Sequence, residues 1–174
     1  MKVVLAKEKD LSEVKEVFYK IVQNMNSNGI SIWNDYYPIE VFEEDIRKKN
    51  LYLLKDHDSL LGAFVMYEHN DIESDVKWKD KKAKAFLLNR LGVNVNYLRK
   101  GIGERLVLEA SLLAKKKGAK FLRLLVVLEN SPAIKLYEKC NFKRVDGIHE
   151  EIISDDYSLF EYAYEKELES DVCN

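Results

Sequence analysis

Two glycines, Gly101 and Gly103, stand one residue apart in the stretch NYLRKGIGERLV, between two cations and a helix-forming run. Residues 84–95 before them are predicted to form a buried strand. The first turn of a helix has N–H groups without partners inside the helix, and its dipole favours negative charge. Glycine lets the backbone approach a phosphate closely, and Arg99 and Lys100 would add positive charge at the rim. The stretch predicts a phosphate site, with an ordinary tight turn before a helix as the alternative.

Two familiar phosphate-binding patterns fail at single residues. The dinucleotide pattern requires a further glycine three residues after Gly103, where this chain has Leu106. The nucleoside-triphosphate loop requires Gly-Lys-Ser/Thr before its helix, and the sequence contains nothing similar. A nicotinamide dinucleotide and a nucleoside triphosphate are therefore not the expected ligands.

Composition limits the class of protein. The 174 residues, 47% of them hydrophobic, predict one domain over residues 1–168 with a short polar tail at 169–174. The net charge of −2 argues against nucleic acid as a partner. No apolar run reaches the roughly 20 residues of a membrane span, and charged residues interrupt the apolar start at residues 1–6. We therefore expect no membrane partner, a cytoplasmic location, reduced thiols at Cys140 and Cys173, and no metal site.

Hydrophobic periodicity predicts alternating strands and helices. In chain order these are a strand at 3–6, a helix from Leu11 to Gly29, a short helix from Pro38, strands at 51–55, 60–69 and 84–95, a helix from Ile102 to Gly118, a strand at 121–128, a helix from Ser131 to Asn141, and strands at 142–148 and 159–166. Asp10 and Glu13 predict a capping box, and Ser131 is the predicted N-cap of its helix. Asn141 is predicted to end that helix in a left-handed conformation. In the first helix, Val14, Phe18 and Val22 are among the apolar residues at helical spacing. The polar stretch 70–82 is predicted to be an exposed connection, with its lysines on a solvated face. This order indicates an α/β (α+β) domain with a mixed central sheet of about seven strands flanked by about four helices.

A second motif lies in the sequence LENSPAIKLYEKCNF. Its members follow the pattern Asn-x-x-Ala-x-x-Leu-Tyr-x-x-x-x-Phe and are Asn130, Ala133, Leu136, Tyr137 and Phe142. With this motif and the glycine loop, the chain resembles the GNAT superfamily of N-acetyltransferases, in particular its small bacterial members. The loop of that family reads Gln/Arg-x-x-Gly-x-Gly/Ala, and the two glycines match. Leu98 occupies the Gln/Arg position, and Arg99 follows it as a substitute.

The resemblance implies acetyl transfer from acetyl-coenzyme A (acetyl-CoA) to a primary amine of a small molecule or peptide. In this fold the fourth and fifth strands are parallel neighbours that splay apart, so the pantetheine arm would pair with the edge of the fourth strand, where Gly92 carries no obstructing side chain. Backbone N–H groups of the glycine loop would hold the pyrophosphate. The cofactor-binding residues implied in this way are Leu91, Gly92, Val93, Arg99, Lys100, Gly101, Ile102, Gly103, Glu104, Asn130, Ala133 and Tyr137. For Asn130 the alternative is a polar cap at a strand end.

The resemblance also implies a general acid. Tyr137 matches the family position that protonates the leaving thiolate; its alternative is a helix aromatic packed into the core. The general base is predicted to be Glu68, with His69 and Glu161 as other candidates, or a water relay in place of all three.

The acceptor pocket is expected to combine aromatic faces with negative charge, which would suit a cationic amine. Trp33, Tyr36 and Tyr37 would supply the aromatic faces, with core packing as their alternative. The acidic residues, which could instead belong to a solvated loop, are Glu150, Glu151, Asp155, Asp156 and Glu161. His57 and His149 have no paired carboxylate at a telling sequence spacing, so we expect both to be exposed.

Two functions stay open at the level of sequence. The first is an active acetyltransferase, which the intact Tyr137 favours. The second is a non-catalytic CoA-binding or regulatory module, which Leu98 favours. Pairing of two copies through the last strands would give a homodimer.

Overall fold

A computed structural model of the chain describes residues 1–69 and 75–168, which form two compact units. The first unit comprises Met1–Met66 and Asn89–Glu109, and the second comprises the described parts of Tyr67–Leu88 and Ala110–Asn174. The expected single domain over 1–168 stays a prediction. The expected polar tail at 169–174 lies outside the described residues.

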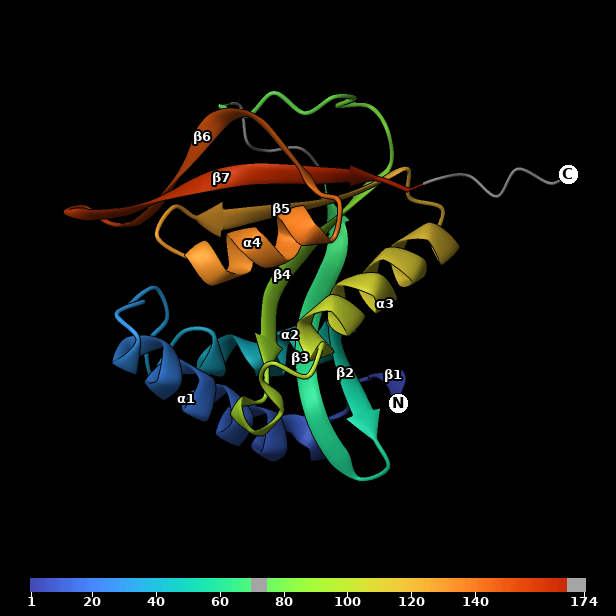
Figure 1. Cartoon of the computed structure of the whole chain (residues 1–174), viewed down its shortest axis with the longest axis vertical. Coiled ribbons are helices and arrows are strands. Elements are labelled where there is room, and N and C mark those ends of the chain that lie inside the picture. Colours follow the sequence, from blue (N-terminus) through green and yellow to red (C-terminus); the bar gives the residue numbers. More distant parts are fainter. Residues whose placement is uncertain (70–74, 169–174) are drawn as a thin grey trace, which may run out of the picture. The chain divides into compact units, whose positions relative to one another are not determined.

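The elements of the described residues follow the predicted order (Figure 1). They are β1 (Lys2–Leu5), α1 (Leu11–Ser27), α2 (Phe42–Arg47), β2 (Leu51–Asp56), β3 (Ser59–His69), β4 (Ala85–Val93), α3 (Ile102–Lys116), β5 (Phe121–Val127), α4 (Ser131–Lys139), β6 (Lys143–Ser154) and β7 (Tyr157–Glu167), with short 3-10 turns η1 (Glu8–Asp10), η2 (Ile39–Val41) and η3 (Val95–Tyr97). The strands form one seven-stranded sheet in the order β1-β2-β3-β4-β5-β7-β6. This confirms the mixed sheet with four helices. Among the described residues, no helix has the length and apolar character needed to cross a membrane.

In the first unit, α1 packs its apolar stripe against aromatic and aliphatic side chains. Val14, Phe18 and Val22 are fully buried, as their helical spacing predicts. The Phe18 ring meets the Phe42 ring of α2 edge-on at 4.6 Å between centroids. The strands β1, β2 and β3 pair antiparallel beside them. This apolar contact fixes α1 and α2 within the unit.

The predicted capping box at the start of α1 is wrong. Neither carboxylate caps the helix with the other: the Asp10 carboxylate accepts the Lys7 N–H at 2.9 Å, and the Lys55 ammonium on β2 donates to Asp10 at 2.9 Å and to Glu13 at 3.0 Å. Burial raises the pKa of Asp10, but the hydrogen bonds from Lys55 and Lys7 outweigh it and lower that pKa. Lys55 of β2 therefore binds the two carboxylates that the sequence predicted to cap the helix.

In the second unit, β7 lies between β5 and β6 and is antiparallel to both (Figure 1). The predicted parallel pairing of β4 and β5 is confirmed from Ala85 opposite Phe121 to Leu87 opposite Arg123. Splaying of these strands farther along stays a prediction, as does a homodimer through the last strands. Asn141 adopts the predicted left-handed conformation after α4, with φ of 67°.

The predicted exposed connection at 70–82 is wrong where the structure describes it, from residue 75 onward, because two of its side chains are in the core. Val76 and Trp78 are buried and pack against Ala163 of β7. Val76 and Trp78 are two apolar residues within a short charged stretch, and this is too few to give a periodic signal. Their burial therefore could not be predicted from the sequence. The lysines of the stretch are exposed, as predicted.

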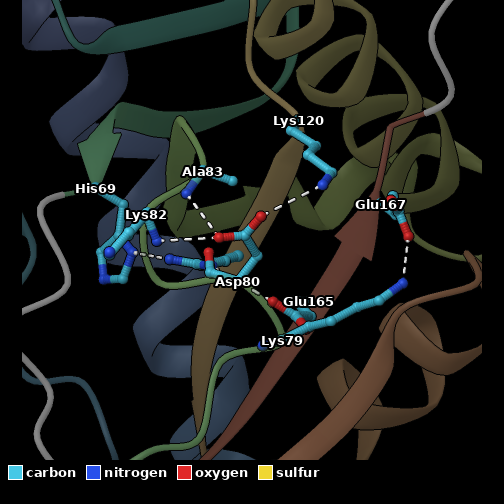
Figure 2. Close-up of polar contacts among 9 residues, drawn as sticks. His69, Lys79, Asp80, Lys82, Ala83, Lys120, Glu165 and Glu167 are labelled. Carbon is cyan, nitrogen blue, oxygen red and sulfur yellow. Dashed lines mark hydrogen bonds and ion pairs between the residues drawn. The ribbon is translucent and has the colours of Figure 1, made fainter.

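A fully buried arginine, Arg123 of β5, anchors this connection. Its guanidinium donates to the Asp80 carbonyl at 2.7 Å, lies 3.2 Å from His69 Nδ1 and pairs with Glu165 at 3.4 Å. It also covers the Trp78 ring at 4.7 Å. Figure 2 shows two exposed ion pairs nearby, Lys120 with Asp80 and Lys79 with Glu167. The buried cation thus contacts groups from three separate segments.

We predict that Arg123→Ala lowers the free energy of unfolding by about 3–5 kcal/mol, because it leaves Glu165 buried without its cation. Urea denaturation measures this loss. Lys79→Ala removes an exposed ion pair from the same region and should change stability little. Equal, small effects of both substitutions would contradict the anchoring role of Arg123.

Candidate functional site

The glycine loop leads from the turn η3 into the start of α3. Arg99 and Gly101 have positive φ angles of 59° and 74°, and no atom lies within 4 Å of where a Gly101 Cβ would stand. The Arg105 N–H donates to the Gly101 carbonyl at 3.0 Å, which begins the helical ladder. By helix geometry, the N–H groups of Ile102 and Gly103 belong to the first turn and point away from the ladder. The loop therefore presents backbone donors beside open space, which is the arrangement an anion requires.

The cations of the loop differ in their contacts. Arg99 and Lys100 are both exposed. The Lys100 ammonium donates to the Asn96 carbonyl at 3.2 Å and lies over the Tyr97 ring at 5.2 Å. Leu98, which stands at the family's Gln/Arg position, is also exposed. Positive charge is thus available at the rim despite Leu98.

The end of β4 carries Leu91, Gly92 and Val93, the residues expected along the pantetheine arm. Gly92 is buried, and a Cβ added there would stand 2.8 Å from Phe18 and 2.9 Å from Ile21. The glycine is therefore required by the close approach of α1, a reason that differs from the expected one of leaving room for a ligand.

Arg90 of β4 is a residue that the sequence analysis missed. It has a positive φ of 46°, which interrupts the regular strand. Its guanidinium forms two hydrogen bonds to the Asp45 carboxylate, at 3.1 and 2.8 Å, and donates to the Tyr37 hydroxyl at 3.2 Å. The Arg90 and Asp45 side chains are only 12% and 7% exposed. The Arg90–Asp45 pair thus ties α2 to β4, and the hydrogen bond to Tyr37 ties the loop before α2 to the same strand.

The aromatic residues expected around the acceptor divide into two kinds. Trp33 is half-buried, and its ring lies 5.9 Å from that of Phe18. Tyr36 is 78% exposed, and Tyr37 is 38% exposed while its hydroxyl binds Arg90. Core packing thus accounts for part of Trp33, whereas Tyr36 and Tyr37 present their rings to solvent.

In the second unit, the second motif forms the start and the middle of α4. The Asn130 side chain accepts the Ala133 N–H at 3.3 Å, so Asn130 is the N-cap and the prediction of Ser131 is wrong by one residue. Asn130 and Ala133 are half-buried. Asn130 thus caps a helix, whereas the alternative that the sequence left open was a cap at a strand end. A coenzyme contact of Asn130 stays a prediction.

Tyr137 is buried in α4, with its ring 5.8 Å from that of Phe142. Burial raises the pKa of the Tyr137 phenol, and the neighbouring Cys140 raises it further. The phenol is therefore protonated at neutral pH, the state that a general acid requires.

The three candidate bases occupy different environments. Glu68 is exposed and lies 4.0 Å from the Lys84 ammonium. His69 is buried against Arg123 and the Trp78 ring. Glu161 of β7 is half-buried, directly opposite His149 of β6. Burial beside a guanidinium gives His69 a structural role, while the other two face solvent at least in part.

The expectation that His149 is exposed without a carboxylate is wrong. Its side chain is 18% exposed, with Nδ1 at 3.1 Å from Asp75 and Nε2 at 3.4 Å from Glu151. Asp75 lies 74 residues away in sequence, which is why no spacing revealed the pair. His57 is exposed, as predicted.

The remaining acids expected near the acceptor are all exposed, and they are Glu150, Glu151, Asp155 and Asp156. They belong to β6 and to the turn before β7. This part of the second unit therefore has an acidic surface beside His149 and Glu161.

Comparison with known proteins identifies a family whose match includes both motifs. Residues 17–142 match the acetyltransferase (GNAT) family. None of the curated proteins compared with the chain matches it.

Solved structures extend the likeness over nearly the whole chain. A protein of Staphylococcus aureus Mu50 assigned as an acetyltransferase is 27% identical, with a TM-score of 0.71 and coverage of 97% of this chain and 100% of that one. A GNAT-family acetyltransferase from Listeria monocytogenes 4b F2365 is 21% identical, with a TM-score of 0.73 and coverage of 96% and 94%. YncA of Salmonella typhimurium, solved with its cofactor acetyl-CoA, is 13% identical, with a TM-score of 0.64 and coverage of 99% and 96%.

The family match spans most of the chain and includes both motifs, the loop before α3 and the turn into α4. The strand order and the parallel pairing of β4 with β5 agree with it. The chain therefore belongs to the acetyltransferase (GNAT) family and is an acyltransferase.

Proposed function

We propose that the protein transfers the acetyl group of acetyl-CoA to a primary amine of a small molecule or peptide by direct attack. The observation that carries the proposal is Tyr137, a buried phenol at the acid position of an intact family motif. A buried, protonated phenol is suited to give its proton to a thiolate as the carbon–sulfur bond breaks.

The residues at the start of α3 fit the diphosphate of the coenzyme. Acetyl-CoA is the cosubstrate of GNAT enzymes and supplies an acetyl group activated as a thioester. The first-turn N–H groups of Ile102 and Gly103 would donate to the diphosphate, with Arg99 and Lys100 adding charge. Gly101 supports this assignment, because a left-handed φ and open space at its Cβ position leave the backbone accessible. Leu91 and Val93 of β4 are proposed to pair with the pantetheine arm, and Asn130 and Ala133 to contact the coenzyme.

The acceptor is proposed to be cationic before it reacts. Trp33, Tyr36 and Tyr37 would pack on its apolar part, and a ring face also attracts an ammonium group. Glu161 would attract the same charge from β7. Within the first unit, the exposure of Tyr36 and Tyr37 supports their part of the proposal. Within the second unit, Glu161 lies beside the acidic surface of the β6–β7 hairpin.

Release of free thiol from acetyl-CoA in the presence of amines tests the function. A panel of polyamines, aminoglycosides, amino acids and peptide N-termini should contain at least one acceptor that accelerates release. Mass spectrometry of that acceptor should show one added acetyl group. Binding of acetyl-CoA without release for every amine would contradict the reaction and leave a coenzyme-binding module, the function that Leu98 favours.

Replacing the proposed acid should separate chemistry from binding. We expect Tyr137→Phe to lower kcat by about 10²–10³-fold, because the thiolate would leave without a proton donor. The affinity for acetyl-CoA, measured by calorimetry, should change less than about threefold, because the ring and its packing are retained. Unchanged kcat in this variant would remove Tyr137 from the mechanism.

Replacing Arg90 should weaken binding of the acceptor amine and leave binding of acetyl-CoA unchanged. Arg90→Lys keeps the charge but loses the paired hydrogen bonds to Asp45, so the loop with Tyr37 should loosen. We expect the KM for the amine to rise about tenfold, the equivalent of one charge-assisted hydrogen bond of roughly 1.5 kcal/mol. The KM for acetyl-CoA should stay unchanged. Arg47→Lys, at an exposed ion pair of α2, is the matched control, and equal amine KM values for the two variants would contradict the positioning role.

A further inference from the structure

The glycine loop and the turn η3 before it are held in shape by few contacts of their own. The side chains of residues 96 and 98–101 are exposed. Arg99 has a left-handed φ of 59°, which is unfavourable for a residue other than glycine. Such a conformation persists where the surrounding structure holds it. The contacts at the two ends of the loop therefore decide how well the first-turn N–H groups of α3 are aligned before an anion binds.

Asn94 joins the entry of this loop to β3. Its backbone N–H donates to the Leu61 carbonyl at 2.9 Å, and its side-chain amide donates to the Leu60 carbonyl at 2.8 Å. Its side-chain oxygen accepts the Asn96 N–H at 3.1 Å, and its carbonyl accepts the Tyr97 N–H at 2.8 Å. One half-buried residue thus binds the strand on one side and the turn on the other.

The exit of the loop rests on the same part of β3. Gly62 is buried, and a Cβ added there would stand 2.6 Å from the Gly92 carbonyl oxygen and 2.8 Å from Leu106 Cδ1 of α3. Leu106 is fully buried, and Ile102 at the start of α3 is buried as well. Residues 60–62 of β3 therefore contact both segments that flank the loop, the end of β4 and the first turns of α3.

The two tasks of the Asn94 side chain require an amide. An amide carries a donor and an acceptor on one short side chain, whereas an ionised carboxylate only accepts. The oxygen caps the turn, as asparagine commonly does at a helix start, while the nitrogen reaches the strand. Leu60 lies 34 residues away in sequence, so no local pattern could reveal this contact.

Lys100 also contacts the turn, but its contacts stay within the loop. Its ammonium donates to the Asn96 carbonyl at 3.2 Å and lies over the Tyr97 ring at 5.2 Å. These contacts keep the turn compact and do not connect it to the sheet. The hydrogen bonds of Asn94 make that connection.

We propose that Asn94 is a positioning residue for the coenzyme, because it ties η3 to β3 and so holds the glycine loop in the conformation that receives the diphosphate. The proposal rests on the proposed binding of acetyl-CoA at this loop. All the residues involved belong to the first unit. A loop that is aligned before binding avoids an ordering cost on binding. If the aligned loop is only a fraction of the population, the apparent Kd rises by the inverse of that fraction.

Calorimetry with two ligands tests this role, because S-acetylpantetheine keeps the thioester of acetyl-CoA but lacks the diphosphate. We expect Asn94→Ala to weaken the binding of acetyl-CoA by about tenfold, the scale of one net hydrogen bond. The Kd for S-acetylpantetheine should stay within about twofold of the original, because that ligand does not use the loop. Asn96→Ala removes the same amide from an exposed side chain of the same turn, and this control should leave both affinities unchanged.

Asn94→Ser gives a graded readout and a second variant should Asn94→Ala fail to fold. Serine can still accept the Asn96 N–H as a cap, but its shorter side chain does not reach the Leu60 carbonyl. The affinity for acetyl-CoA should therefore fall by about threefold, between the original and Asn94→Ala. Urea denaturation checks that each variant is folded under the conditions of the binding assay.

The ratio of the two affinities decides the outcome. Should the original protein prefer acetyl-CoA while the folded Asn94 variants keep that preference in full, the positioning role would be overturned and the diphosphate site would stand. A variant that loses both ligands equally would show a general structural effect and would also overturn the role. Equal affinities of the original protein for the two ligands would overturn the diphosphate site, and the role of Asn94 with it.

Discussion

The first turn of α3 is the constraint on which the coenzyme half of the proposed site depends. A helix begins with N–H groups that its own ladder cannot satisfy, and an anion is a favourable partner for them. The chain reaches this start through Gly101, whose left-handed φ of 74° carries no Cβ penalty and leaves open space above the turn. Arg99, itself at φ of 59°, and Lys100 surround the turn with positive charge. The family match over residues 17–142 is therefore consistent with a local physical reason for its glycine loop.

Features governed by neighbours along the chain could be read from the sequence. The helical spacing of Val14, Phe18 and Val22 predicted a buried stripe, and these three side chains are fully buried. Asn141 was predicted to end α4 in a left-handed conformation, and its φ is 67°. The order of strands and helices and the parallel pairing of β4 with β5 followed from such local signals and from the resemblance to GNAT proteins. Even the error at the cap of α4, Asn130 in place of Ser131, is one residue wide, because both side chains are good caps.

Features that depend on distant partners could not be read in this way. Arg90 binds Asp45, which is 45 residues away in sequence, and His149 contacts Asp75, which is 74 residues away. Each pair connects a strand to another segment, so it exists only after the sheet has formed. The sequence offered no window in which the two partners occur together. The same limit explains why the predicted capping box is wrong, because its acids Asp10 and Glu13 bind the distant Lys55 of β2.

Calorimetry with acetyl-CoA and with S-acetylpantetheine tests the central claim most directly, because the second compound keeps the thioester but lacks the diphosphate. If the start of α3 captures the diphosphate, acetyl-CoA should bind at least about 100-fold more tightly, the equivalent of roughly 3 kcal/mol. This difference should shrink as salt is added, because it arises from charge. Equal affinities for the two compounds, or no heat with acetyl-CoA, would contradict the account.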